Sequence, residues 1–459
     1  MEYLTIAGGV PLSGTVEAAG SKNAALPIMA ASILAEEPVR LEGVPRLRDV
    51  ATLSRVLEEL GVEVTPLRAG GLSGKGDIHL LPERPFGCFA QKVDVPFSGG
   101  LRLETIDPRP VRARCDLVRR MRASFCVLGP LLARRGRAIV SLPGGCNIGP
   151  RPVDRHLAGL AALGAELCIE RGYVVARARR LVGTELSLTG PNGPTVTGTA
   201  NILCAAALAR GKTVIHGAAR EPEIVDLGRF LNAIGARIAG LGTSTLRIDG
   251  VRELGGTTYR IIPDRIEAGT LLLAAAISRG SATVTGVVPE HLRAVLGGLR
   301  AAGIEVRAGR DWVAVEARER PRPVNVTAQP YPGIPTDLQA QWMALLATAD
   351  GVSTIEDRVF PTRLTHVAEL NRLGARITLC GPTAVVRGVP RLSGARVVAS
   401  DLRASAALVL AGLAAEGETR VDRIHHLDRG YERLDEKLAR LGARIQRCES
   451  RQLSPVNNW

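Results

Sequence analysis

A short phrase recurs six times along the chain and constrains the fold more than any other feature of the sequence. An apolar helical run ends in a glycine, and a β-type run begins at once. The phrase reads LGVEV, LGAEL, IGARI, AGIEV, LGARI and LGARI, and it starts at positions 60, 163, 234, 302, 373 and 441. The intervals are 103, 71, 68, 71 and 68 residues. This regular spacing indicates one supersecondary unit that is repeated along the chain.

A second phrase keeps the same period. Apolar helices that end in small residues and a turn occur roughly two dozen residues before each glycine phrase, at 30–37, 129–136, 204–211, 273–280, 343–351 and 410–417. A strand such as TVIHG or ATVTG follows each of these helices. The unit is therefore predicted as helix, strand, helix and strands over roughly 70 residues. Six such units predict an α/β protein.

The first interval is longer than the others by roughly 33 residues. The excess falls at about residues 65–97, a stretch rich in glycine and proline. Such a composition is typical of turns and loops rather than of a further repeat. We expect an insertion there, as an elaborated loop or an extra hairpin.

Composition limits the class of protein and the class of partner. With 459 residues, 46% of them hydrophobic and 23% charged, the chain is predicted to be soluble and to form more than one core. The formal net charge of +14 favours anionic partners. The arginines are scattered, and neither a basic tail nor an aromatic-rich RNA-recognition motif is present, so we expect a phosphorylated metabolite and no nucleic acid.

The cysteines and the apolar stretches bear on metals and on location. The eight cysteines form no CxxC pair and have no zinc-site spacing, so no metal is expected. Residues 1–14 lack the pattern of a secretory signal, and the longest apolar stretches are too short to span a bilayer. These features predict a cytoplasmic protein with no membrane association and with reduced thiols. Among them, Cys168, Cys204 and Cys380 are expected to be inert core residues.

Cations stand where several of the repeated helices are expected to begin. Lys22, one of only five lysines, lies at the first of these starts, and Arg122 and Arg403 lie at others. Helix N-termini attract anions and are unfavourable places for a cation. We therefore expect an anion to bind among them. Asp264 and Asp401 also lie at helix starts, where each is either an ordinary N-cap or a functional group.

Cys146 lies in the segment SLPGGCNIGPRPVDRH, residues 141–156. Glycines flank the cysteine and the segment has no hydrophobic periodicity, which argues against core packing. Loops on rigid scaffolds often carry reactive groups, and nearby arginines lower the pKa of a thiol. Cys146 is thus a candidate reactive thiol.

Nine short motifs occur in order along the chain. They are GSKNAAL (20–26), MRAS (121–124), SLPGGCNIGPRPVD (141–154), REPEIVD (220–226), PDRIEAGT (263–270), PTDLQAQ (335–341), VFPTRLTHVAEL (359–370), SDLRASAALVLAG (400–412) and DRGYERLDEKL (428–438). Together they resemble the motifs of the UDP-N-acetylglucosamine enolpyruvyl transferases, and the resemblance extends from residue 1 to about residue 447.

The resemblance implies an α/β fold of two similar domains, an inside-out α/β barrel with three βαβ-type repeats in each domain. The first domain would take residues 22–262, including the insertion at about 65–97 and the cysteine loop at 141–154. The second would combine residues 1–21 with 263–459. The active site would lie in the cleft between the two domains.

The resemblance also implies a reaction. The enolpyruvyl group of phosphoenolpyruvate is transferred to the 3-hydroxyl of UDP-N-acetylglucosamine by addition and elimination, with release of phosphate, as the first committed step of peptidoglycan synthesis. It implies no cofactor and no metal. The expected partners are these two small molecules, and the chain is expected to be a monomer or a weak homo-oligomer.

Roles for single residues follow from the matching motifs. Cys146 would be the proton donor or product-release group and the target of fosfomycin, and Asp337 would be the base for the sugar hydroxyl. The catalytic set would also include Lys22 and Arg429. The cations around phosphoenolpyruvate would be Lys22, Arg122, Arg151, Arg363, Arg403 and Arg429. The sugar nucleotide would contact Asn23, Arg151, Pro152, Val153, Asp154, Thr195, Val196, Thr197, Asp337 and Val359.

Departures from the family pattern leave alternatives. Asn192 and Gly193 stand where some members have a lysine near the diphosphate, and Cys126 replaces a large apolar residue. One alternative is a paralogue that acts on another UDP-sugar in specialised metabolism, such as antibiotic synthesis. A shikimate 3-phosphate enzyme is disfavoured because its family lacks the PGGC loop. A catalytically idle repeat protein that binds anions is disfavoured by the presence of Cys146, Asp337 and the arginine set.

Overall fold

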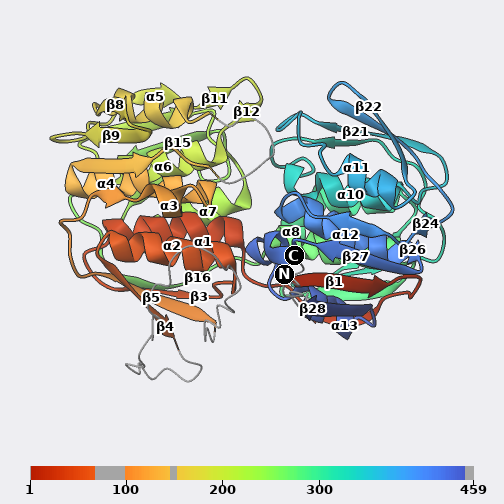
Figure 1. The fold of residues 1–459 in the computed structure, drawn as a ribbon. Helices are drawn as coiled ribbons and strands as arrows, with labels where there is room; N and C mark the ends of the chain where they lie inside the picture. The colour runs from red at the N-terminus through yellow and green to blue at the C-terminus, as the bar shows by residue number, and fades with distance from the viewer. Residues whose placement is uncertain (1, 68–98, 145–151, 450–459) are drawn as a thin grey trace, which may run out of the picture.

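The computed structural model describes residues 2–67, 99–144 and 152–449 of the chain. Two bodies lie side by side (Figure 1), and in the second body β1 (Glu2–Ala7), near the start of the chain, pairs with β28 (Arg444–Glu449), near its end.

The repeated unit predicted from the sequence is present six times. In the first copy it consists of α1 (Lys22–Ala31), β3 (Val39–Glu42), α2 (Arg48–Glu59) and a hairpin of β4 (Val62–Leu67) with β5 (Gly100–Thr105). The glycine of each recurring phrase has a positive φ, between 76° and 110°. A residue with a Cβ adopts this conformation only at a cost, which explains why the phrase keeps its glycine.

The other copies use the same order of elements. The first helices are α4 (Leu128–Arg135), α6 (Val196–Ala207), α8 (Arg265–Ile277), α10 (Gln339–Leu346) and α12 (Leu402–Ala414). The strands that follow them are β7 (Arg137–Ser141), β13 (Lys212–His216), β17 (Ser281–Thr285), β21 (Val352–Asp357) and β27 (Glu418–Asp422). The second helices are α5 (Asp154–Ala162), α7 (Pro222–Ala233), α9 (Arg293–Ala301), α11 (Val367–Arg372) and α13 (Leu434–Arg440).

Each unit ends in an antiparallel pair of strands. Four of these pairs are local hairpins: β8 (Glu166–Glu170) with β9 (Tyr173–Arg177), β14 (Arg237–Ala239) with β15 (Thr245–Asp249), β18 (Glu305–Ala308) with β19 (Trp312–Glu316), and β22 (Arg376–Cys380) with β23 (Thr383–Arg387). In the last unit β28 (Arg444–Glu449) pairs instead with β1 (Glu2–Ala7) from the start of the chain. The N-terminal strand therefore completes the final repeat.

A fourth strand pairs in parallel with the strand that follows each first helix, giving six four-stranded sheets. These parallel strands are β16 (Thr257–Arg260), β6 (Arg112–Ala113), β10 (Glu185–Ser187), β2 (Ser13–Glu17), β20 (Val326–Ala328) and β25 (Arg396–Val398). Strand β16 returns to pair with β3, and β2 pairs with β17. Each body is thus closed by a strand that is distant in sequence.

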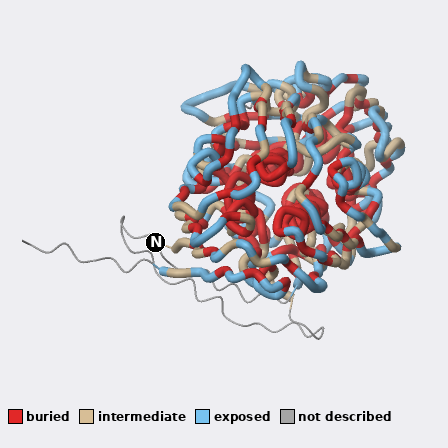
Figure 2. Tube along the Cα trace, turned by 90° about the vertical axis from the view of Figure 1, so that its right-hand side faces the viewer, coloured by how far each residue is buried: buried red, intermediate tan, exposed pale blue. Residues whose placement is uncertain are grey.

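The first helices of the units lie inside and the sheets lie outside. Every residue of α8 is buried, and α12 and α10 are buried along nearly their whole length. Helices that are apolar on all sides are stable only when they are surrounded by protein. Buried helices at the centre and exposed strands at the periphery are visible in Figure 2. This arrangement confirms the predicted inside-out α/β fold.

The buried apolar side chains form two separate cores. One core runs from Ala24 to Ile261, and the other joins Leu4–Val16 to residues from Ile266 to Ile445. Alanine, leucine, valine and isoleucine supply most of both cores. Among the described residues, no helix has both the length and the apolar character needed to cross a bilayer.

The overlong first repeat is explained in part by the structure. Strands β4 and β5 pair from Val62 with Thr105 to Leu67 with Gly100, so residues 65–67 of the expected insertion belong to a strand. The rest of that insertion lies in 68–98, outside the described residues.

The prediction for the three cysteines is correct for one of them only. Cys204 on α6 is buried, whereas Cys168 on β8 and Cys380 on β22 are exposed. Cys168 lies on the same face of its strand as Glu166 and Glu170, and Cys380 on the same face as Arg376, and these faces meet solvent.

Candidate active site

The first helices of the two bodies start beside one another. Ser21 caps α1 by accepting a hydrogen bond from the Ala24 N–H, and the neighbouring Lys22 N–H donates to Asp264 Oδ2 over 3.4 Å. Asp264 is itself the N-cap of α8, where it accepts from the Ile266 and Glu267 N–H groups. The starts of α1 and α8 therefore meet where the two bodies join.

Asp337 is the centre of one group of predicted site residues. It lies in the short helix η4 (Thr336–Leu338), directly before α10. Its carboxylate accepts hydrogen bonds from Arg363 at 2.9 Å and from Arg403 at 3.0 Å, both in the second body. Asn23 of the first body donates to the same carboxylate over 3.3 Å. Four residues predicted from separate motifs thus meet at one carboxylate.

The environment of Asp337 keeps it ionised. Burial alone raises the pKa of a carboxyl group because the charged form loses its hydration. The positive charges of Arg403, Arg363 and Lys22 more than offset this effect, so the pKa of Asp337 lies well below its ordinary value. The carboxylate is therefore available to accept a proton, but it is a weak base while both guanidinium groups contact it.

A second carboxylate, Asp49, joins two further predicted cations. Lys22 Nζ lies 3.0 Å from Asp49 Oδ2, and Arg429 Nε lies 2.8 Å from Asp49 Oδ1. Lys22 and Asp49 belong to the first body, whereas Arg429 ends the short helix η5 (Ile424–Arg429) of the second. Burial alone would raise the pKa of Asp49, but the charges of Lys22 and Arg429 lower it by a larger amount. The pKa of Asp49 therefore lies below its ordinary value.

The sequence analysis missed Asp49. It lies in the first turn of α2, where an acidic residue is ordinary because it interacts favourably with the helix dipole. Only its 3% exposure and its two cationic partners distinguish it from other residues at helix starts. No signal in the sequence alone points to this role.

The predicted anion among the helix-start cations is supplied within this structure by the protein itself. Asp49 lies against Lys22, and Asp337 lies against Arg403. For Asp264 and Asp401 the capping interpretation holds, since each accepts from two N–H groups of its own helix. Asp401 also lies 4.0 Å from Arg363, so it contributes to the same charged cluster.

A second group of predicted residues lies around the starts of α5 and α6. Arg122, in the short helix η2 (Arg122–Val127), donates to the Pro152 carbonyl over 3.0 Å. Val153 precedes α5, and Asp154, its first residue, is exposed.

Thr195 caps α6 through the Gly198 N–H, and Val196 and Thr197 form the first turn of that helix. The Thr197 hydroxyl lies 3.2 Å from His156 Nε2.

Val359 lies next to the position where the chain departs from the family pattern. Asn192 Nδ2 donates to the Val359 carbonyl over 3.4 Å. Asn192 lies in the turn between β11 (Thr189–Gly190) and β12 (Gly193–Pro194) of the first body, whereas Val359 follows β21 of the second. This turn therefore contributes to the contact between the two bodies. The predicted residues Cys146 and Arg151 lie outside the described residues.

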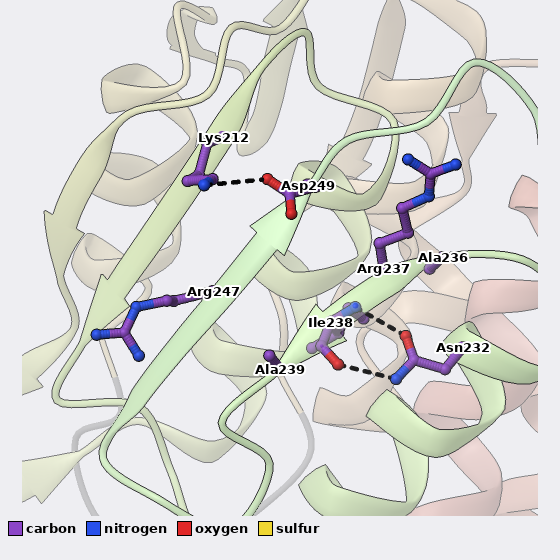
Figure 3. A pocket seen from close by; sticks show the side chains of 8 residues that line it. All are labelled: Lys212, Asn232, Ala236, Arg237, Ile238, Ala239, Arg247 and Asp249. Carbon is purple, nitrogen blue, oxygen red and sulfur yellow. Dashed lines mark hydrogen bonds and ion pairs between the residues drawn. The ribbon is translucent and has the colours of Figure 1, made fainter.

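One open cavity lies elsewhere. It has a volume of about 380 Å³ and is lined by residues of β13, β14 and β15 and the end of α7. Figure 3 shows Lys212 directed toward Asp249, and Asn232 bonded to the backbone of Ile238. No residue of the charged cluster lines it. We place the candidate site at the charged cluster, where cations from both bodies lower the pKa values of Asp49 and Asp337.

The geometry fits a small, multiply charged anion. Lys22, Arg363, Arg403 and Arg429 come together through two carboxylates, the buried Asp49 and the half-buried Asp337, and both bodies contribute to the cluster. Guanidinium groups bind carboxylate and phosphate oxygens through paired N–H donors. The fold and site thus define a two-domain α/β protein suited to anionic substrates.

Comparisons with known proteins agree with this description. Residues 6–78 and 103–438 match the family model described as EPSP synthase (3-phosphoshikimate 1-carboxyvinyltransferase). The chain is 49% identical over 447 residues to a UDP-N-acetylglucosamine 1-carboxyvinyltransferase of Halorhodospira halophila, covering 97% of this chain and 99% of that one. It is 50% identical over 452 residues to the enzyme of the same name from Nitratidesulfovibrio vulgaris, covering 97% and 99%.

Solved structures are similar over almost the whole chain. The enolpyruvyl transferase NikO from Streptomyces tendae has a TM-score of 0.82 at 26% identity, covering 98% of this chain and 99% of that one. An EPSP synthase from Acinetobacter baumannii has a TM-score of 0.68 at 16% identity, with 98% and 100% covered, and shows the fold alone. The chain belongs to the enolpyruvyl (1-carboxyvinyl) transferase family.

Proposed function

We propose that this protein transfers the enolpyruvyl group of phosphoenolpyruvate to the 3-hydroxyl of UDP-N-acetylglucosamine and releases phosphate. The observation that carries the proposal is the contact of Asp337 with Arg363, Arg403 and Asn23, which places a half-buried carboxylate among cations at the junction of the two bodies. The names of relatives about half identical over nearly their full length support the same acceptor.

Phosphoenolpyruvate would compete with the protein's own carboxylates. Its carboxylate and phosphate carry the same sign of charge as Asp337 and Asp49, and they suit the same cations. As Arg363 and Arg403 turn toward the substrate, their effect on Asp337 weakens and the pKa of that carboxyl group rises. Substrate binding thus converts Asp337 from a weak base into a better one.

The reaction is an addition followed by an elimination. The sugar 3-hydroxyl oxygen bonds to C2 of phosphoenolpyruvate as its proton passes to Asp337, and a proton is added to the C3 methylene. Loss of a proton from the resulting methyl group then re-forms the double bond as the C2–O bond to phosphate breaks. Cationic groups stabilise the negative charge on the departing phosphate. Lys22 and Arg429 fit this role, and Cys146 is proposed as the proton donor to C3 or as a group for product release.

The sugar nucleotide is proposed to bind at the starts of α5 and α6. Helix N-termini present N–H groups that suit diphosphate oxygens. The residues assigned there are Arg151, Pro152, Val153, Asp154, Thr195, Val196 and Thr197, with Val359 contributed by the second body. Arg122, which donates to the Pro152 carbonyl, is proposed together with Arg151 to reach phosphoenolpyruvate from this side. Asn23 and Asp337 would face the sugar at the other end of the substrate.

The cellular role follows from this reaction. An enolpyruvyl ether of UDP-N-acetylglucosamine is a precursor of peptidoglycan, so we place the protein in cell-wall synthesis and hence in cell shape, division and the cell cycle. We further propose that it acts in the cytoplasm as a monomer or a weak homo-oligomer, without a cofactor, and that fosfomycin alkylates Cys146.

The test is phosphate release from phosphoenolpyruvate in the presence of UDP-N-acetylglucosamine. Asp337→Asn keeps the shape of the side chain but removes its basicity, and loss of a general base typically slows a reaction about 10²- to 10⁴-fold. Asp350→Asn, a change at an exposed side chain in the turn between α10 and β21, is the matched control and should retain full activity. Turnover by Asp337→Asn at the wild-type rate would remove this residue from the mechanism.

Fosfomycin provides an independent test of the cysteine assignment. Treatment should stop phosphate release and add one inhibitor mass to the peptide that contains Cys146, and excess phosphoenolpyruvate or UDP-N-acetylglucosamine should change the rate of labelling. A labelled peptide elsewhere, or full activity after treatment, would contradict the assignment.

A second candidate is transfer to another UDP-sugar in specialised metabolism. The turn that contains Asn192 favours this second function, because some members have a lysine near the diphosphate there. In this chain Asn192 contacts the Val359 carbonyl of the second body instead. The structural similarity to NikO is compatible with it. Phosphate release with a different UDP-sugar, and none with UDP-N-acetylglucosamine, would select this second function.

A further inference from the structure

A buried histidine, His156, lies behind the proposed nucleotide site. It is the third residue of α5, is 2% exposed, and packs edge-on against Phe125 with ring centroids 5.2 Å apart. Its two ring nitrogens face two different side chains. Nδ1 lies 2.8 Å from Asn201 Nδ2, and Nε2 lies 3.2 Å from the Thr197 hydroxyl.

The backbone fixes the orientation of the Asn201 amide. Asn201 Oδ1 accepts a hydrogen bond from the Gly129 N–H at 2.8 Å, so the other end of the amide is the NH₂ group. That NH₂ group donates to the Phe125 carbonyl at 3.0 Å. Its second hydrogen faces His156 Nδ1. Reversing the amide would place donor against donor at Gly129 and acceptor against acceptor at Phe125.

The Asn201 amide in turn fixes the tautomer of His156. Because Nδ1 accepts from Asn201, the ring is neutral and its hydrogen is on Nε2. Nε2–H therefore donates to the Thr197 oxygen. The hydroxyl hydrogen of Thr197 cannot point back at His156, and among the described residues no other group accepts it. It points away from the buried ring, at the half-exposed start of α6.

We propose that His156 is a positioning residue that holds the Thr197 hydroxyl as a hydrogen-bond donor to a diphosphate oxygen of the nucleotide sugar. The proposal rests on the proposed function, since it needs a diphosphate at the start of α6. In this proposal the preference for an anion comes from the fixed direction of the Thr197 O–H bond. A hydroxyl that is free to rotate would spend part of its time with its lone pairs toward the anion, whereas this one presents its hydrogen.

Two substitutions of His156 separate this role from simple packing. His156→Gln keeps an N–H donor near the position of Nε2, whereas His156→Asn keeps only an acceptor near the position of Nδ1. The matched pair at Thr197, which accepts the hydrogen bond from His156, is Thr197→Ser, which keeps the hydroxyl, and Thr197→Val, which removes it. The measurement is binding of UDP-N-acetylglucosamine and of UDP alone, followed by calorimetry, with the KM for phosphoenolpyruvate determined in parallel.

The expected pattern is specific. Thr197→Val and His156→Asn should each weaken binding of UDP-N-acetylglucosamine about tenfold, which corresponds to one charge-assisted hydrogen bond. His156→Gln and Thr197→Ser should stay within about threefold of the wild type. The KM for phosphoenolpyruvate should change less than about twofold in all four variants, because Lys22, Arg363, Arg403 and Arg429 lie in the other group of residues and none of the four variants alters a cation.

A double variant distinguishes positioning from folding. In the Thr197→Val background His156→Asn should cause no further loss of affinity, because its target is already absent. Equal binding by all variants, or a further full loss in the double variant, would overturn the proposal. If the wild type binds UDP but not UDP-N-acetylglucosamine, the acceptor proposed above is wrong. The affinities of the His156 and Thr197 variants for UDP then test the role of His156. Binding of neither probe by the wild type would overturn both proposals.

Discussion

The contact most open to a quantitative test is the bridge from Asp49 to Lys22 and Arg429. Each carboxylate oxygen serves one cation, at 3.0 and 2.8 Å, and the three side chains are 4%, 8% and 15% exposed. Asp49→Asn keeps the volume but removes the charge and replaces one acceptor by an NH₂ donor. That donor must face either Lys22 or Arg429, and the two cations then repel each other without a carboxylate between them.

The magnitude follows from burial. An ion pair at 3 Å is worth about 5 kcal/mol in Coulomb energy at an effective dielectric constant of about 20, and desolvation removes part of that gain. Removing one partner of a buried pair typically costs about 3–5 kcal/mol. We therefore expect Asp49→Asn to lower the free energy of unfolding by about 3–5 kcal/mol.

The assay is urea denaturation at several pH values, with Asp116→Asn as the matched control. Asp116 pairs with Arg114 at the surface, where side chains are 52% and 65% exposed, and such pairs contribute less than about 1 kcal/mol. The pKa of Asp49 is lowered on folding, so its contribution is complete above the unfolded pKa and is lost as pH falls through the folded pKa. The difference between wild type and Asp49→Asn should thus be constant from pH 5 to 8. A loss no larger than that of the control would refute the reasoning.

Three further changes test other parts of the structure. Arg265→Met removes one partner of the buried pair with Glu223, whose two hydrogen bonds measure 2.9 and 3.2 Å, and should cost about 3–5 kcal/mol in urea denaturation, most of which a second change, Glu223→Leu, should restore. Lys22→Arg should leave the melting temperature nearly unchanged but weaken phosphoenolpyruvate binding about tenfold in calorimetry, since a planar guanidinium does not replace a compact ammonium; equal affinity would contradict this. Burial lowers the pKa of His366 to about 4, so the unfolded state binds more protons than the native state between about pH 4 and 6.5, and stability falls as pH drops through that window. His366→Gln should flatten that slope in denaturation at pH 4.5 and 7, and an unchanged slope would assign the acid sensitivity to other groups.

The local features of the fold could be predicted because they are local in origin. Helix, strand and glycine cap follow from hydrophobic period and from the left-handed φ of Gly61, Gly164 and their four counterparts, and these depend on neighbours in sequence. The exposure of Cys168 and Cys380 was not predictable in this way. It depends on which face of each strand packs against the core, and that is settled by the packing of the sheet rather than by the strand's own residues.

The candidate site could likewise be predicted from the sequence only in part. An uncommon cation at a helix start pointed to Lys22, Arg122 and Arg403, and the resemblance to the family added Asn23, Asp337, Arg363 and Arg429. Neither source indicated that Asp49 would join Lys22 to Arg429, which lies 380 residues after Asp49 in the chain. Neither indicated that Asn201 would fix the tautomer of His156.

The amino-acid sequence by itself thus determined the six units, their caps and the family, since each rests on short-range pattern. The tertiary structure alone decided which carboxylate neutralises which cation. Such pairing depends on desolvation and on distances of about 3 Å between charged side-chain atoms. These side chains meet only when β1, β2 and β16 pair with strands that are distant in sequence and bring the helix starts together.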